Sequence, residues 1–127
     1  MTQAGSQAWQ FYRDVTALQE VWTVRDDKGF PSPKTSSGQR AQPFWSTKHR
    51  AEKVISEVLA YRAFVPFRVS WRDFCEKWVP GLEADGILVG VNWSGARALG
   101  YDLPPRDVQR NVEAIFGSSN GLSQSAP

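Results

Sequence analysis

The sequence has few of the residues that form disulfides and metal sites, and little net charge. It contains one cysteine, Cys75, and one histidine, His49, in 127 residues, and its formal net charge is only +2. A single cysteine excludes an internal disulfide, and one cysteine with one histidine cannot form a structural zinc site. The small net charge gives no strong attraction to nucleic acid or to an anionic membrane surface. We therefore expect no metal and no cofactor.

Long apolar runs are also missing, because charged residues interrupt every hydrophobic stretch. This pattern argues against a membrane-spanning helix and against a membrane partner. Residues 1–7 are small and polar, and they lack the basic start and apolar core of a signal peptide. From these features we expect a cytoplasmic protein with a flexible N-terminus at residues 1–7.

No combination of residues typical of a known catalytic mechanism is present. His49 lies opposite the apolar stripe of its predicted helix, so we interpret it as a surface residue rather than a general base. Cys75 lies between Trp71 and Trp78 on an apolar helix face, and we interpret it as a core residue rather than a nucleophile. The glycine-rich phosphate-binding loops of nucleotide enzymes are absent. We assign no catalytic residues, and the sequence favours a protein that is not an enzyme.

The composition that remains is that of an ordinary globular domain with many tryptophans. Hydrophobic residues make up 41% and charged residues 22% of the chain, which is typical of a folded domain with one core. Six tryptophans are present, and tryptophan usually anchors a core or an interface. We expect a single α+β domain at residues 8–117 and a disordered, serine-containing tail at residues 118–127.

Apolar periodicity predicts about four helices. The first is expected over residues 6–19, and the second after the capping residues Ser46 or Thr47. The third is expected after Ser70, with Pro80 ending or restarting it, and the last from Pro104 to Gly117. Their apolar stripes are expected to bury Phe11, Val15, Leu18, Val54, Ile55, Phe74, Trp78, Val112 and Phe116.

Runs of β-branched and aromatic residues predict about five strands. These are expected at residues 21–25, 40–45, 65–69, 87–93 and 97–102, which makes the element order α-β-β-α-β-α-β-β-α. Because strands follow one another in pairs, we expect hairpins and therefore a mostly antiparallel sheet covered by helices. The stretch from Asp26 to Gly38 is expected to be a long mobile loop or an irregular hairpin.

Five short strings together resemble a known family. They are Val21–Asp26, Gly29–Pro31, Pro43–Ser46, Gly90–Gly95 and Gly100–Leu103, and they occur in this order. In combination the chain resembles the bacterial family named domain of unknown function 2750, over roughly Ala8 to Phe116. The resemblance implies a small bacterial α+β domain, and it carries over no activity, cofactor, partner or catalytic residue.

The candidate binding site is the tip of the last predicted hairpin. Asn92, Trp93, Ser94 and Arg97 place an amide, an indole, a hydroxyl and a guanidinium close together, and tryptophan and arginine dominate binding hot spots. The simpler interpretation is turn chemistry, with Trp93 covering the edge of the core and Arg97 stacking on its ring. If the two hairpins are adjacent, the site also includes Trp22, Arg25 and Trp45.

These observations leave three functions open. The leading hypothesis is a non-enzymatic module that binds another protein, or a second copy of itself in a homodimer. The alternative is binding of single-stranded nucleic acid along the face of Lys48, Arg50 and Lys53, although Glu52 and Glu57 dilute that charge. A weaker alternative is a small enzyme or small-molecule binder with a cleft that sequence does not reveal.

Overall fold

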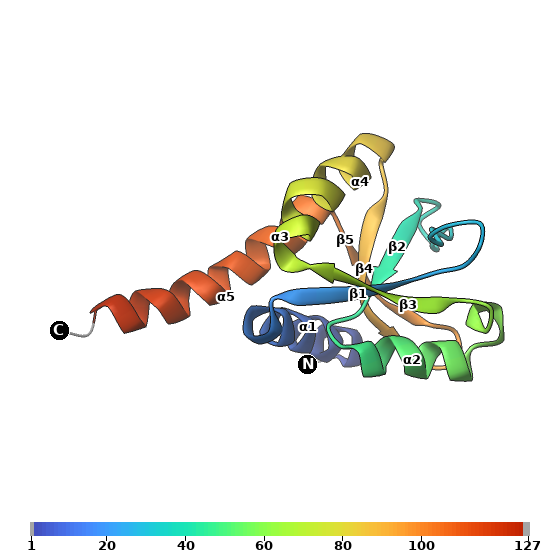
Figure 1. The fold of residues 1–127 in the computed structure, drawn as a ribbon, viewed down its shortest axis with the longest axis horizontal. Coiled ribbons are helices and arrows are strands. Elements are labelled where there is room, and N and C mark those ends of the chain that lie inside the picture. The colour runs from blue at the N-terminus through green and yellow to red at the C-terminus, as the bar shows by residue number, and fades with distance from the viewer. Residues whose placement is uncertain (1, 126–127) are drawn as a thin grey trace.

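The α+β architecture with five strands is confirmed. The structure is a computed structural model that describes residues 2–125, with side chains described as far as Gly117. Figure 1 shows the helices packed around a small group of strands, with α5 extending away from the body. The elements are α1 (Gln3–Leu18), β1 (Glu20–Arg25), β2 (Ala41–Phe44), α2 (Lys48–Glu57), the 3-10 turn η1 (Leu59–Tyr61), β3 (Val65–Ser70), α3 (Trp71–Asp73), the π-helical turn η2 (Phe74–Trp78), α4 (Val79–Asp85), β4 (Leu88–Ser94), β5 (Leu99–Leu103) and α5 (Pro105–Ser125).

The strand pairing differs from the prediction. Among the described residues, β1 pairs with β3 in one antiparallel sheet, and β2, β4 and β5 form a second sheet in that order. The β4–β5 hairpin was predicted, but β2 runs parallel to β4. The expected β1–β2 hairpin was therefore wrong, because the chain between these strands is long enough for each to find a non-local partner.

Two tryptophans join the two sheets. The backbone N–H of Trp22 donates to the carbonyl of Trp45 at 2.7 Å, and the N–H of Trp45 donates to the carbonyl of Trp22 at 2.6 Å. This antiparallel bridge links the middle of β1 to the residue that follows β2. This pair of backbone hydrogen bonds therefore joins the two sheets.

The first and the last helix are both longer than the sequence predicted. α1 begins at Gln3, so residues 3–7, which were expected to be flexible, are helical; the Thr2 hydroxyl caps the helix by accepting from the N–H of Gly5. α5 continues past Gly117 to Ser125. Gly117 does not adopt the left-handed backbone conformation that ends many helices. Residues 126–127 of the expected tail lie outside the described part of the chain.

Residues 71–85 form one continuous helical segment, in agreement with a single predicted helix there. Pro80 does not end it. Instead, the N–H of Val79 reaches back five residues to the carbonyl of Phe74, which makes a π-helical turn just before the proline. This wider turn lets the chain accommodate a residue without an N–H, as such bulges do elsewhere.

The strands separate two apolar clusters. One contains Phe11, Val15 and Val112 with the inward residues of β4 and the 71–85 segment, and the other contains Trp45, Val54 and Trp93. Two predicted core residues, Leu18 and Phe116, are instead 52% and 43% exposed. Leu18 is the last residue of α1, where Gln19 already caps the helix, and Phe116 lies in the second half of the long α5.

The segment between β1 and β2 forms short turns of its own. Asp26 pairs with Gly29 and Lys34 pairs with Arg40, each as an isolated antiparallel bridge. The N–H of Thr35 donates to the carbonyl of Gln39 at 2.9 Å. The second of these turns carries residues 33–36 to the β4–β5 hairpin, where they line a cleft.

Candidate functional site

The β4–β5 hairpin contains a bulge at Asn92. Val91 lies opposite Tyr101 and Ser94 lies opposite Leu99, so two residues of β4 face the single residue Gly100 of β5. Asn92 has a φ of 50°, a left-handed conformation that asparagine tolerates better than most residues. The extra residue reverses the alternation of side chains along β4. Trp93 therefore points to the same face as Gly90.

The side chain of Asn92 is buried within a polar network under α1. Its Oδ1 accepts from the N–H of Ser46 at 2.9 Å, and its Nδ2 donates to the Ser46 hydroxyl at 3.1 Å and to the Gln7 carbonyl at 3.3 Å. The Ser46 hydroxyl in turn donates to Asp14 Oδ2 at 2.7 Å. Asn92 thus ties β4, the end of β2 and α1 together, and this internal role explains its position.

Trp93 lies flat against two glycines. A Cβ added to Gly90 would be 2.2 Å from the Trp93 ring, and one added to Gly100 would be 2.9 Å from it. The indole N–H donates to Asp102 Oδ1 at 2.8 Å, and the Trp93 carbonyl accepts from the indole N–H of Trp45 at 2.8 Å. The two sequence segments Gly90–Gly95 and Gly100–Leu103 therefore pack together as one structural unit, the bulged β4–β5 hairpin.

The predicted site residues fall into three groups. Asn92, Trp45 and Trp93 are buried, with exposed fractions of 0%, 0% and 4%. They therefore pack beneath the residues of the surface and contribute almost nothing to the surface themselves. Trp22 and Arg25 make internal contacts on β1, with Lys48 over the Trp22 ring and Arg25 over the Phe67 ring. The ring of Trp93 packs against Gly90, and the expected Arg97–Trp93 stack is not among the cation–π contacts of the described residues. Ser94 and Arg97 remain at the surface of the hairpin tip.

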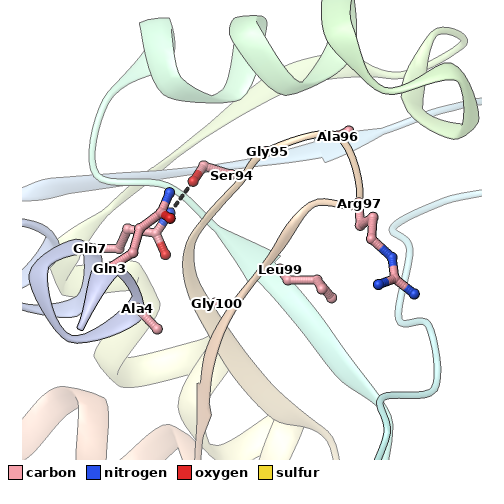
Figure 2. A pocket seen from close by; sticks show the side chains of 9 residues that line it. All are labelled: Gln3, Ala4, Gln7, Ser94, Gly95, Ala96, Arg97, Leu99 and Gly100. Atoms are coloured by element: carbon pink, nitrogen blue, oxygen red, sulfur yellow. Dashed lines mark hydrogen bonds between the residues drawn. The ribbon is translucent and has the colours of Figure 1, made fainter.

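Two shallow hollows lie beside the hairpin tip on the side of α1. Figure 2 shows one of them, where Gln3, Ala4 and Gln7 of α1 face the tip and the Gln7 amide donates to the Ser94 hydroxyl. The other lies between α1 and α2 and is lined in part by Arg50 and Lys53, with Glu57 beside them. In Figure 2, Arg97 extends away from α1, toward the opposite side of the tip.

On that opposite side lies a larger cleft of about 650 Å³. Its walls are the 33–36 turn, residues 58–61 around η1, and the start of β5. This volume lies within the range of roughly 300–1,000 Å³ that is usual for small-molecule sites. Its lining residues are Pro33, Lys34, Thr35, Ser36, Val58, Ala60, Tyr61, Trp93, Arg97, Ala98, Leu99, Gly100 and Asp102.

The cleft combines apolar walls with charged groups that lack ion-pair partners. Within the described side chains, neither Lys34 nor Arg97 takes part in an ion pair. Burial raises the pKa of the Asp102 carboxyl, although the hydrogen bond from Trp93 partly opposes this. Burial also raises the pKa of the Tyr61 phenol. Perturbed ionisable groups in a cleft are typical of functional sites.

The raised pKa of Asp102 predicts an unusual effect of Asp102→Asn on stability. The unfolded carboxyl ionises near its ordinary pKa of 3.8 and the folded one only at higher pH, so ionisation favours the unfolded chain in that window. The contribution of Asp102 to the stability should therefore fall as the pH rises from about 4, until the folded carboxyl is also ionised. The amide introduced by Asp102→Asn does not titrate and can still accept from Trp93, so the variant should be more stable at pH 7. Urea unfolding at pH 3 to 7 measures this, and a variant that is less stable at pH 7 would contradict it.

Sequence reasoning missed Lys34, Tyr61 and Asp102. Lys34 and Tyr61 reach the cleft from segments far apart in the chain, and no local pattern indicated that they meet. Asp102 did leave a signal, because Gly100 and Asp102 are two residues apart and alternate residues of a strand share a face. A glycine and an acidic residue two positions apart, and so on the same face of a strand, can indicate a large side chain that packs over both of them.

The residues most often used for chemistry lie elsewhere. Cys75 is half-buried on the π-helical turn, and burial raises its pKa to about 12, which leaves it almost entirely in the unreactive thiol form at neutral pH. His49 is exposed on α2. Among the described residues, no three histidine, cysteine, aspartate or glutamate side chains are grouped as metal ligands. None of the helices in residues 2–125 is long and apolar enough to cross a bilayer.

Comparison with known proteins identifies a family but no characterised relative. No curated protein and no solved structure matches the chain. Residues 8–112 match the family model described as protein of unknown function (DUF2750). The match spans both the bulged hairpin and the 33–36 turn that lines the cleft. The chain therefore belongs to the DUF2750 family, as its strings of shared residues predicted.

Proposed function

We propose that the protein binds a small polar molecule in the cleft between the 33–36 turn and the β4–β5 hairpin. The observation that carries this proposal is the lining of the cleft, where apolar residues occur together with Lys34 from the 33–36 turn and with Arg97 and Asp102 from the β4–β5 hairpin. None of these three charged residues has an ion-pair partner among the described side chains. Ligand pockets typically combine apolar surface with a few convergent polar groups in this way.

Filling the cleft tests this function. Ala60 lines the cleft and is exposed, so a tryptophan there can occupy the space without disturbing the core. Ala63 is equally exposed and lies outside the cleft lining, which makes Ala63→Trp the matched control. Wild type, Ala60→Trp and Ala63→Trp are screened against a library of polar metabolites by thermal unfolding, since a ligand that binds the native state raises its melting temperature.

We expect compounds that stabilise the wild type to stabilise Ala63→Trp equally and to have no effect on Ala60→Trp. Circular dichroism of the ligand-free proteins verifies that Ala60→Trp is folded. If Ala60→Trp responds to the same compounds as the wild type, the cleft is not their binding site. A library that stabilises none of the three proteins would also count against the proposal.

The protein-interaction function has one specific observation in its favour. Among the described strands β5 pairs only with β4, and its residues Leu99 and Tyr101 are 59% and 45% exposed. An unpaired strand edge with exposed apolar side chains can accept an extended segment of another chain. Ala60→Trp separates the two functions, because it occupies the cleft and leaves free the edge residue Tyr101, which does not line the cleft.

A further inference from the structure

We infer that the cleft takes a small zwitterion of the amino-acid type, with an anionic group between Lys34 and Arg97 and an ammonium group at Asp102. This inference rests on the proposed function and adds the chemical class of the ligand. It follows from the charged residues that line the cleft, with Lys34 on the 33–36 turn and Arg97 and Asp102 on the β4–β5 hairpin.

The anionic end of the ligand is assigned by two cations that line the cleft from different segments of the chain. Lys34 lies on the 33–36 turn and Arg97 on the β4–β5 tip, and both line the cleft. Both side chains are exposed, and neither is paired with a carboxylate among the described residues. A guanidinium binds a carboxylate through two parallel hydrogen bonds, which makes arginine a good partner for an organic acid. Thr35 and Ser36 line the same wall as Lys34.

The cationic end is assigned by the carboxylate of Asp102, which lines the cleft. One oxygen of Asp102 accepts from the indole of Trp93 at 2.8 Å. No lysine or arginine pairs with this carboxylate among the described side chains. An ammonium group on the ligand would supply the opposite charge that the protein itself does not, in a partly desolvated place where charge-assisted hydrogen bonds are strong.

Apolar side chains also line the cleft. Pro33, Val58, Ala98 and Leu99 line the cleft together with its charged groups. A short methylene chain between the two charged groups of the ligand would lie against these side chains and be removed from water. The cleft therefore favours a molecule with charge at both ends over one with a single charged end.

Three probes with five carbons each test this assignment: 5-aminovalerate, which has both charged groups, valerate, which has only the carboxylate, and pentylamine, which has only the ammonium. Dissociation constants are measured from the amide chemical shifts of residues 98–102 in the whole protein. The variants are Arg97→Gln and Asp102→Asn, with Arg62→Gln as the control because Arg62 is exposed and outside the cleft lining.

We expect 5-aminovalerate to bind about tenfold more tightly than either singly charged probe, because each charged hydrogen bond is worth about that factor. Arg97→Gln should weaken 5-aminovalerate and valerate about tenfold and leave pentylamine unchanged, and Asp102→Asn should weaken 5-aminovalerate and pentylamine and leave valerate unchanged. Arg62→Gln should change none of the three.

Other outcomes separate this inference from the proposed function. If the probes bind at residues 98–102 without preference for the zwitterion, or if Arg97→Gln and Asp102→Asn weaken all three equally, the ligand class is wrong and the cleft remains a binding site. If metabolites stabilise the protein in an Ala60-dependent manner and none of these probes binds, the ligand class is overturned as well. If neither the probes nor the library act at the cleft, both the ligand class and the proposed function fail.

Discussion

Gly90→Ala should lower the free energy of unfolding by about 3 kcal/mol or more, which is large for the addition of one methyl group. The new Cβ would lie 2.2 Å from the ring of Trp93. That ring cannot move aside easily, because it is 4% exposed and its N–H is bonded to Asp102. The methyl group therefore displaces a buried indole and breaks its hydrogen bond. Urea unfolding followed by circular dichroism measures the loss.

Gly81→Ala is the matched control for this change. Gly81 lies in α4, and a Cβ added there would have nothing within 4 Å. Alanine is favoured over glycine in a helix by up to about 1 kcal/mol, so this variant should be as stable as the wild type or slightly more so. Equal stability of Gly90→Ala and the wild type would show that Trp93 does not pack over Gly90.

Asn92→Ala should have the next largest effect, a loss of about 3 kcal/mol in the free energy of unfolding. The substitution leaves the buried N–H of Ser46 without the acceptor that now lies 2.9 Å away, and such a group costs about 1–3 kcal/mol. It also places alanine at a φ of 50°, which costs a residue with a Cβ about 1–2 kcal/mol.

Asn92→Gly separates these two contributions. Glycine adopts the positive φ without strain but also lacks the side-chain amide, so it should lose the hydrogen bonds and keep the bulge. We expect its stability to lie between those of the wild type and Asn92→Ala, about 1 kcal/mol above the latter. If the glycine and alanine variants unfold at the same urea concentration, backbone strain at this position contributes nothing.

Local sequence signals predicted most of the elements but little of their pairing. The helix α2 was evident from its apolar spacing, and its Thr47 cap is confirmed, because the hydroxyl accepts from the N–H of Arg50. The β4–β5 hairpin followed from an apolar run that ends in Ser94–Gly95. The parallel pairing of β2 with β4 left no such signal, because it depends on how segments far apart in the chain pack in three dimensions.

The site was predicted in part for a similar reason. Trp93 and Arg97 were singled out by residue type, and both line the cleft. The burial of Trp93 followed from the bulge at Asn92, whose left-handed backbone reverses the side-chain alternation that a regular strand would have. Another wall of the cleft is formed by the 33–36 turn. No local sequence pattern indicated that this turn reaches β5, and only the folded chain shows it.

The central claim is that the cleft beside the bulged hairpin is a ligand site, and a crystal structure with the most strongly stabilising metabolite tests it most directly. We predict electron density for the compound between residues 33–36 and 97–102, with its anionic group near Lys34 and Arg97 and its donor group near Asp102. An empty cleft, with the compound bound only at another surface of the protein, would contradict the account.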